Sequence, residues 1–411
     1  MLYQLYELQR AGMAPMRMFA AGAMAMLDNS LNPLGATAMG RLTSAALNSF
    51  EHSTRSFGKP AFGFAHTEID GRAVAVREQV IDARPWCDLV RFRRAAERPH
   101  DAKLLIVAPL SGHYATLLRG TVEAFLPDHD VYITDWHDAR DVPAQAPDFG
   151  LDDYIDIVMD HLRLLGPSTH VLAVCQPAVP VLAAAALLNE SEPAAAPRSM
   201  TLIGGPIDTR EGPTAVNDFA TSHTLDWFAA NVVHSVPFGH PGFLRRVYPG
   251  FLQLAGFMAM NLDRHMQAHW QMFLHLAQGD GEPLAAKRRF YEEYRSVMDL
   301  SATYYLQTIQ GVFQEHLLPR GLFTHRGRLV DPAAIERTAM LTIEGERDDI
   351  SGLGQTRAAH KLAVHLPAAM HAHIEQPGVG HYGLFNGSRF RTEIAPAIKR
   401  FIEAHGGARE G

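Results

Sequence analysis

Residues 170–188 read HVLAVCQPAVPVLAAAALL, and this stretch decides the fold. Residues 171–174 form a short apolar run rich in valine, which is typical of a buried strand. The residues after Pro177 are mostly alanine and leucine, which favour helix. Cys175 therefore lies at a strand–turn–helix junction. Such a junction lifts a nucleophile to the carboxyl end of a parallel sheet and directs the N–H of the next residue to the same point.

The turn departs from the usual form of a nucleophile elbow. Glycine commonly stands two residues before and two residues after the nucleophile, but this chain has Ala173 and Pro177 there. Alanine is small, and proline is tolerated in the first turn of a helix because its missing N–H has no partner there. The motif is workable, although Cys175 could equally be an inert buried thiol when the turn is considered alone.

Further apolar runs on both sides of this stretch indicate more strands separated by helical segments. An alternation of this kind predicts a mostly parallel sheet with helices on both faces. Residues 206–330 interrupt it with an aromatic and Met-rich segment at helical spacing. We expect four parts: a helical N-terminal extension (1–60), the first part of the core (61–205), a helical cap or lid (206–330) and the second part of the core (331–411).

Two later strands are each followed by a residue that could act with Cys175. Residues 340–343 precede an acidic loop containing Asp348 and Asp349, and residues 371–374 precede a glycine-rich loop containing His381. A nucleophile, an acid and a histidine in this order, each just beyond a strand, is the chain order of the α/β-hydrolase triad. The sequence therefore predicts an α/β-hydrolase fold with an inserted helical cap.

The roles in this triad follow from the chemistry of the groups. His381 would take the proton of Cys175, because the thiolate is the nucleophile. Asp348 would hold the other ring nitrogen; we prefer it to Asp349 because it lies one residue nearer the strand. The N–H of Gln176 and the N–H of Ser111, in the loop after the strand at 104–107, are expected to form the oxyanion hole. Ser111 has no elbow of its own, which disfavours it as a nucleophile.

Composition excludes several other classes of protein. With 37 Lys and Arg against 44 Asp and Glu in 411 residues, the net charge is −7, so no basic face for nucleic acid is expected. No apolar run is long enough for a transmembrane segment. Two cysteines, Cys87 and Cys175, fit a reducing compartment. His265 and His269 stand four residues apart without a suitable carboxylate, so we predict no metal site and no cofactor.

Three motifs carry a family resemblance. The opening MLYQLYE (1–7), the elbow VCQP (174–177) and the acidic loop EGERDDIS (344–351) together resemble the intracellular poly(3-hydroxybutyrate) depolymerases of bacteria, and the likeness extends over essentially the whole chain. These enzymes are related to polyhydroxyalkanoate synthases, whose elbow is usually Gly-x-Cys-x-Gly. Ala173 and Pro177 depart from that elbow, and Asp349 stands where a synthase typically has histidine. These departures favour the depolymerase. Carried over residue by residue, the resemblance implies the triad Cys175, Asp348 and His381.

The resemblance also implies a substrate, a partner and a location. The expected activity is hydrolysis of the storage polyester in native amorphous granules to 3-hydroxybutyrate oligomers and monomer, at the granule surface in the cytoplasm. Three alternatives stay open: a synthase-like acyltransferase, a small-molecule cysteine hydrolase of the dienelactone type and a non-catalytic granule-binding protein. The sequence leaves undecided the monomer length, water or a thiol such as coenzyme A as acyl acceptor, the granule-coat partners and whether the chain forms a homo-oligomer.

Overall fold

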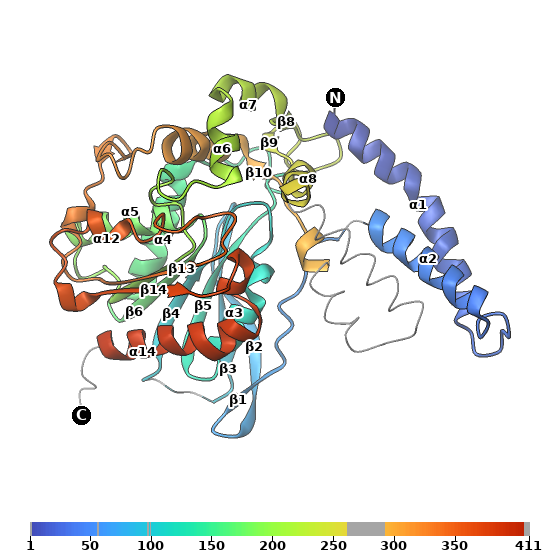
Figure 1. Cartoon of the computed structure of the whole chain (residues 1–411), viewed down its shortest axis with the longest axis horizontal. Helices are drawn as coiled ribbons and strands as arrows, with labels where there is room; N and C mark the ends of the chain where they lie inside the picture. The colour runs from blue at the N-terminus through green and yellow to red at the C-terminus, as the bar shows by residue number, and fades with distance from the viewer. Residues whose placement is uncertain (1, 56, 97, 99, 261–291, 407–411) are drawn as a thin grey trace.

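A nine-stranded sheet forms the centre of the computed structural model, which describes residues 2–55, 57–96, 98, 100–260 and 292–406 (Figure 1). In spatial order its strands are β1 (His66–Ile69), β2 (Arg72–Ala83), β3 (Cys87–Arg94), β5 (His129–Trp136), β4 (Ala102–Val107), β6 (Thr169–Val174), β7 (Ser199–Ile203), β13 (Ala339–Gly345) and β14 (His371–Gln376).

The pairing of these strands is that of an α/β-hydrolase sheet, which confirms the predicted fold. β1, β2 and β3 pair antiparallel, β3 pairs antiparallel with β5, and all pairs from β5 to β14 are parallel. The register aligns Val107 with Ala173 and Val174 with Ile203. The carboxyl ends of the parallel strands therefore meet at one edge of the sheet, and this edge carries the residues predicted to act in catalysis.

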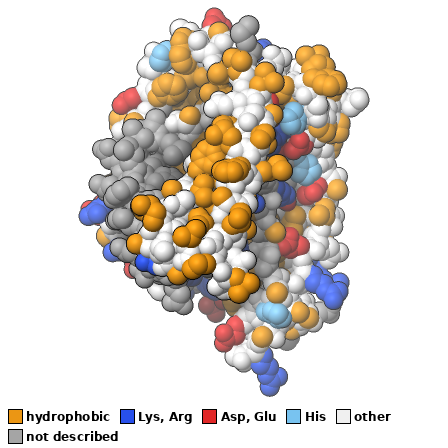
Figure 2. Space-filling model, turned by 90° about the vertical axis from the view of Figure 1, so that its right-hand side faces the viewer, with side chains coloured by type: hydrophobic (Ala, Val, Ile, Leu, Met, Phe, Trp, Pro, Cys, Tyr) orange, Lys and Arg blue, Asp and Glu red, His pale blue; other side chains and the backbone are white. Residues whose placement is uncertain are grey.

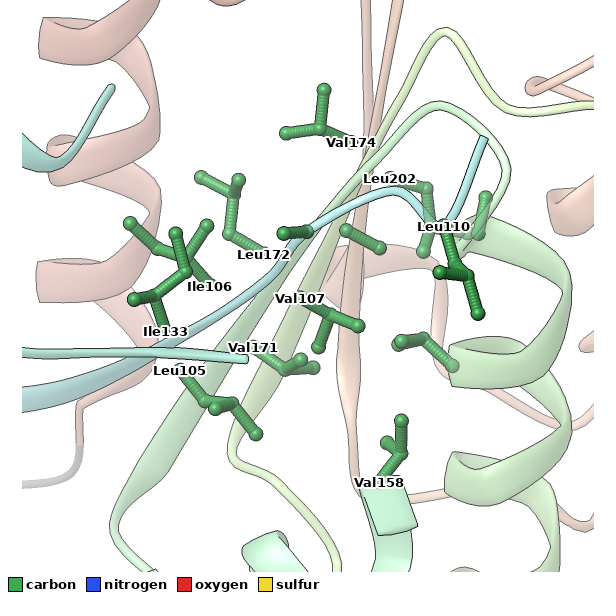
Figure 3. Packing of buried hydrophobic residues seen from close by; sticks show 14 of the residues in the cluster. Leu105, Ile106, Val107, Leu110, Ile133, Val158, Val171, Leu172, Val174 and Leu202 are labelled. Atoms are coloured by element: carbon green, nitrogen blue, oxygen red, sulfur yellow. The ribbon is translucent and has the colours of Figure 1, made fainter. Parts of the chain in front are cut away.

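Helices cover both faces of the sheet (Figure 1). One face carries α3 (Arg119–Phe125) and α14 (Ala395–His405), and the other carries α4 (Leu151–Leu165) and α5 (Ala178–Ser191). Every residue of α5 from Ala178 to Leu188 is buried, so all but the last three residues of the helix behind the elbow lie inside the core. Figure 3 shows the aliphatic side chains of the central strands, among them Val107, Val171 and Leu202, packed together in this core.

Residues 206–330 contain both helices and short strands where the structure describes them. The helices are α6 (Ala215–Ser222), α7 (Leu225–Asn231), α8 (Gly250–Met260) and α11 (Ala302–Thr308), which continues as a π-helical turn (Ile309–Gln314). The strands are β8 (His234–Ser235), β9 (Arg246–Tyr248), β10 (Leu300–Ser301), β11 (Thr324–His325) and β12 (Arg328–Leu329). The pair His265 and His269 and the cap aromatic Trp270 lie outside the described residues.

The N-terminal extension is a hairpin of α1 (Leu2–Leu27) and α2 (Ala38–Thr54), which projects from the side of the molecule (Figure 1). A proline inside a helix usually breaks or kinks it, but α1 continues through Pro15. A proline removes one backbone hydrogen bond, and water can satisfy the freed carbonyl of an exposed helix. The first turn of α1 is anchored to the body: the Tyr3 hydroxyl donates to Asp299 Oδ2 at 2.5 Å, and the ring of Tyr6 stacks on Phe251.

Three short helical segments and four 3-10 turns complete the part of the chain that the structure describes. The helices are α12 (Ala359–Leu362) and α13 (Gly387–Arg389), and a π-helical turn (Phe390–Ile394) leads from α13 into α14. The 3-10 turns span Ala115–Leu118, Pro332–Ala334, Ala368–Met370 and His381–Leu384. The last of these turns begins at the histidine predicted to act in catalysis.

Candidate active site

Cys175 lies on a strained turn between β6 and α5. Its φ angle is +69°, in the left-handed region that residues other than glycine rarely adopt. Its N–H donates to the Ile203 carbonyl at 2.7 Å, and its own carbonyl accepts from the Ala178 N–H at 3.1 Å. These bonds hold the strained backbone in place, and the thiol is only half-buried. The turn thus has the backbone geometry of a nucleophile elbow, with Ala173 and Pro177 in place of the usual glycines.

His381 and Asp348 are hydrogen bonded to each other. The His381 Nδ1–H donates to Asp348 Oδ2 over 2.8 Å, and both side chains are buried. The second oxygen of Asp348 accepts the N–H groups of Ile350 and Ser351 at 2.9 Å each, which fixes the carboxylate in its orientation. Asp349, the competing acid, is exposed on the same loop. Of the two adjacent carboxylates, Asp348 therefore contacts the imidazole.

The charges around His381 favour its protonated form. Burial lowers the pKa of His381, but the charges of Asp348 and of a Cys175 thiolate, together with hydrogen bonds to both residues, raise it well above its ordinary value. An imidazole held between a carboxylate and a thiol can support a thiolate–imidazolium pair. The three residues have the spatial relation of a catalytic triad.

Two consecutive glycines allow these residues to approach each other. Gly204 has a φ of +54°, and a Cβ there would come within 3.2 Å of His381 Cε1 and 3.3 Å of Asp348 Oδ2. A Cβ on Gly205 would lie 2.1 Å from the Cβ of Ala178, at the start of the helix behind the elbow. Any larger residue at Gly205 would have to displace that helix, so the end of β7 is packed directly against the elbow and the triad.

Glu344 supports the acid loop, a role that was not predicted from the sequence. Its buried carboxylate accepts the N–H groups of Gly354, Thr356 and Arg357 at 2.8–3.0 Å. The Thr356 hydroxyl in turn bonds the N–H and the carbonyl of Gly205, at 2.8 and 3.0 Å. Glu344 thus ties the loop after Asp348 to the glycines beside the elbow. The sequence signal that could have found it is a glutamate inside an otherwise apolar strand.

The loop after β4 lies beside the elbow, because β4 and β6 are neighbouring parallel strands. The Ala108 carbonyl that begins this loop accepts hydrogen bonds from Trp136 Nε1 at 2.8 Å and from the Tyr154 hydroxyl at 3.0 Å. Within the described part of the chain, the N–H groups of Ser111 and Gln176 donate no hydrogen bond to a protein acceptor. Both N–H groups are therefore available to a ligand, as an oxyanion hole requires.

Aromatic rings surround the histidine. The His381 ring lies 6.0 Å from the Tyr382 ring and 5.7 Å from the Phe385 ring, edge to face in both pairs. Tyr382 packs in turn on Tyr294 from the cap. His113 is also buried here, and burial lowers its pKa to about 4, so it is neutral near pH 7. These rings pack around the buried side chain of His381.

Within the residues that the structure describes, the remaining cysteine and the other ligand types offer no competing site. Cys87 is a free thiol, fully buried, and burial raises its pKa, which makes it unreactive. Among the residues described in the structure, no group of three His, Cys, Asp or Glu side chains could hold a metal ion. None of the described helices has the length and apolar character needed to cross a bilayer.

Comparison with known proteins gives one family match. Residues 204–406, which are 203 of the 411 residues, match the family model described as "PHB de-polymerase C-terminus". The matched segment contains Asp348 and His381, but it begins after Cys175 and so does not include it. The match supports a hydrolase that is similar to PHB depolymerases, and hence ester hydrolysis. A search of curated protein sequences finds no match.

Solved structures of hydrolases are similar to this chain only at a distance. An esterase from Rhodococcus is 14% identical, with a TM-score of 0.45, over 80% of this chain and 98% of its own. A monoacylglycerol lipase from Paleococcus ferrophilus is 13% identical, with a TM-score of 0.43, over 74% of this chain and 94% of the lipase chain. A membrane phospholipase A is 13% identical, with a TM-score of 0.46, over 97% of this chain and 98% of the phospholipase chain. With TM-scores this low, the fold assignment rests on the strand order described above.

Proposed function

We propose that the protein is an intracellular poly(3-hydroxybutyrate) depolymerase that cleaves ester bonds through Cys175, His381 and Asp348. The observation that carries this proposal is the buried hydrogen bond between His381 Nδ1 and Asp348 Oδ2, with the same imidazole in contact with a thiol on a strained elbow. The match of residues 204–406 to a PHB depolymerase family supports the choice of substrate.

In the acylation step, His381 takes the thiol proton and Cys175 attacks the ester carbonyl carbon. The C–S bond forms as the carbonyl π electrons move onto oxygen, and the N–H groups of Gln176 and Ser111 stabilise the resulting oxyanion. Asp348 stabilises the imidazolium and keeps the ring oriented. When the intermediate collapses, the C–O bond to the leaving chain breaks. His381 then returns its proton to the departing hydroxyl oxygen, which leaves a thioester on Cys175.

In the deacylation step, water takes the place of the leaving chain. His381 removes a proton from the water as it attacks the thioester carbonyl, and the same two N–H groups bind the second oxyanion. Collapse breaks the C–S bond, releases a 3-hydroxyacyl carboxylic acid and returns the proton to Cys175. The elbow, the histidine and both oxyanion donors are thus used twice in one catalytic cycle.

The exposed surface supports a polyester granule as the partner. Hydrophobic side chains gather on the face that carries the N-terminal hairpin (Figure 2), and the exposed ones on α1 include Leu8, Met18, Phe19 and Met26. A neutral polyester offers no charges to bind, so an apolar surface of this kind suits it. Thioether side chains adapt to irregular apolar surfaces because they are flexible and polarisable. We therefore propose that the protein acts at the granule surface in the cytoplasm.

The test is incubation of native amorphous polyhydroxybutyrate granules with the wild-type protein and with Cys175→Ala, followed by chromatography of the soluble products. We expect the wild type to release 3-hydroxybutyrate and its oligomers, and Cys175→Ala to release none while it still sediments with granules. Release by the alanine variant at the wild-type rate would contradict the triad. Chain growth with release of coenzyme A from 3-hydroxybutyryl-CoA would instead identify a synthase-like acyltransferase.

A further inference from the structure

The loop after β4 (residues 108–114, here called the oxyanion loop) is held by a part of the cap that lies far from it in sequence. The Met298 N–H donates to the Gly112 carbonyl at 2.7 Å. Gly112 has a φ of +104°, and a Cβ there would lie 2.4 Å from Gln253 Oε1, so the loop and the cap meet without room for a side chain. Gly112 directly follows Ser111. These contacts therefore support the backbone beside the N–H group that the proposed oxyanion hole uses.

A buried carboxylate next to Met298 connects this part of the cap to the N-terminal helix. Asp299 Oδ2 accepts the Tyr3 hydroxyl at 2.5 Å, and Asp299 Oδ1 accepts the N–H of Gly250, the first residue of α8, at 2.9 Å. Tyr3 and Asp299 are both buried. A hydrogen bond to a carboxylate is stronger than one between neutral groups. Asp299 is thus held from α1 on one side and from α8 on the other.

A second buried carboxylate links Asp299 to the oxyanion loop. Asp138 Oδ1 accepts the Asp299 N–H at 3.1 Å, and Asp138 Oδ2 accepts the Tyr114 hydroxyl at 3.2 Å. Arg140 Nε lies 3.0 Å from Asp138 Oδ2 and supplies a positive charge beside the two carboxylates. Tyr114 lies three residues beyond Ser111, so this cluster holds the loop at a second point.

We propose that Tyr3 is a positioning residue for the oxyanion hole, acting through Asp299 on the loop that carries Ser111. This inference rests on the proposed function and deepens it, because it gives the first turn of α1 a part in catalysis that the rest of the hairpin does not have. Without the Tyr3 hydroxyl, Asp299 loses a partner and the cap residues that hold Gly112 shift. The oxyanion donor is then misplaced, while the triad is held by separate contacts around β7 and β13. Misplacing a catalytic group by about 1 Å can cost a factor on the order of 10² in rate.

The test compares Tyr3→Phe with the wild type on 4-nitrophenyl 3-hydroxybutyrate. We expect kcat to fall about tenfold with KM unchanged, because acylation and deacylation use the same oxyanion hole and slow by the same factor. Tyr114→Phe should lower kcat in the same way, since it frees the loop at its other attachment. The matched control is Tyr6→Phe, which should keep full activity, because Tyr6 packs on Phe251 through a ring that phenylalanine retains.

A reaction that forms no oxyanion separates a displaced hole from a damaged triad. Methyl methanethiolsulfonate transfers its methylthio group to a thiolate: the thiol proton of Cys175 passes to His381, a new S–S bond forms and methanesulfinate leaves. No carbonyl oxygen becomes charged in this step. We expect Tyr3→Phe to react at the wild-type rate, measured as the mass gained at Cys175, with Cys175→Ala as the blank.

Two results would overturn the proposal. One is an unchanged kcat in Tyr3→Phe, and with a lowered Tm this result would show that Tyr3 only stabilises the fold. The other is an equal loss of kcat and of the rate with methyl methanethiolsulfonate, which would show a general disturbance of the elbow. Neither result would touch the proposed hydrolysis, which fails only if Cys175→Ala keeps its activity.

Discussion

A single imidazole links the two acid–base steps of the proposed reaction. His381 holds Asp348 with one nitrogen and contacts Cys175, and its raised pKa makes it a ready partner for a thiolate. Asp348 can act only through this ring, because its other oxygen is occupied by two backbone N–H groups. The orientation of one carboxylate therefore controls both proton transfers.

The first prediction separates the two neighbouring acids. Asp348→Asn should lower kcat on a soluble ester by a factor on the order of 10⁴, because the amide favours the wrong tautomer of His381. Asp349→Asn is the matched control and should retain most of the activity, since this side chain is exposed. Steady-state kinetics of both variants provide the check. If Asp349→Asn had the larger effect, the role of orienting residue would pass to Asp349.

The sequence predicts which residue types follow each strand, but not which of two neighbours points inward. Cys175, Asp348 and His381 could be named because each follows an apolar run in the chain order of a known triad. The choice between Asp348 and Asp349 rested only on distance from the strand, whereas the structure shows directly which carboxylate meets the ring. The close approach of Gly204 and Gly205 to the triad and the elbow depends on the packing of segments far apart in sequence, so no local pattern reveals it.

At the scale of elements, β13 and the loop that follows it act as one unit. Glu344 ends the apolar part of the strand and binds three N–H groups of the loop, which connects through Thr356 to Gly205. One buried carboxylate therefore supports both the loop that follows Asp348 and, through Thr356, the glycine beside the elbow.

The second prediction tests this support. Glu344→Gln should lower kcat at least tenfold and shift the pH profile of kcat/KM, because the amide group cannot accept three N–H bonds as the carboxylate does and the Asp348 loop moves. Granule sedimentation should not change. Glu375→Gln is the control, since Glu375 is the register neighbour of Glu344 on β14 and is exposed. A fall in Tm with an unchanged pH profile would show that Glu344 only stabilises the fold.

The third prediction concerns the pairing of β6 with β7. His170 is buried opposite Ser199, bonds its hydroxyl through Nδ1 at 2.8 Å, and has a pKa lowered to about 4, mainly by burial. Below its unfolded pKa near 6.5, only the unfolded chain takes up the proton, so stability is lost as the pH falls from about 6.5 towards 4.

The measurement compares the wild type with His170→Asn, which keeps a polar group near the position of Nδ1. Between pH 6 and pH 5 the wild type should lose about 1 kcal/mol more of its free energy of unfolding than the variant, since one proton corresponds to about 1.4 kcal/mol per pH unit. Denaturant titrations at several pH values would show this. Parallel pH dependence of the two proteins would contradict the assignment.

How far the elements could be predicted depended on their length and periodicity. The apolar strands around the elbow can be predicted from their sequence, but β1 cannot, because His66–Ile69 is short and polar. The strands β8, β9 and β10 have two or three residues each, which is too few to show an alternation of apolar and polar side chains. They form because they pair with one another. Pro15 does not end α1, because the helix is largely exposed around it and water can satisfy the freed carbonyl.

At the scale of the whole molecule, the N-terminal hairpin extends the apolar surface beyond the catalytic body (Figures 1 and 2). It is joined to the body through Tyr3 and Tyr6 of α1, and Arg295 donates hydrogen bonds to the carbonyls of His52 and Ser53 near the end of α2. If granules are the partner, this hairpin and the catalytic edge serve separable steps, attachment and hydrolysis.

The fourth prediction tests this separation. Met18→Ser combined with Met26→Ser should lower the ratio of granule-bound to free protein at least tenfold, because both side chains are about 70% exposed or more and lose apolar contact. Hydrolysis of a soluble ester should be unchanged. Leu164→Ser removes an exposed apolar side chain from α4 and is the control. Equal loss of granule binding in the control would mean that the hairpin has no special part in attachment.

The measurement that tests the central claim most directly is mass-spectrometric mapping of the acyl-enzyme. The protein would be mixed with 4-nitrophenyl 3-hydroxybutyrate, quenched in acid within milliseconds and digested for peptide analysis. We predict a 3-hydroxybutyryl thioester on Cys175 in the wild type and no adduct in Cys175→Ala. An adduct on Ser111, or full turnover by the Cys175→Ala variant, would contradict the account.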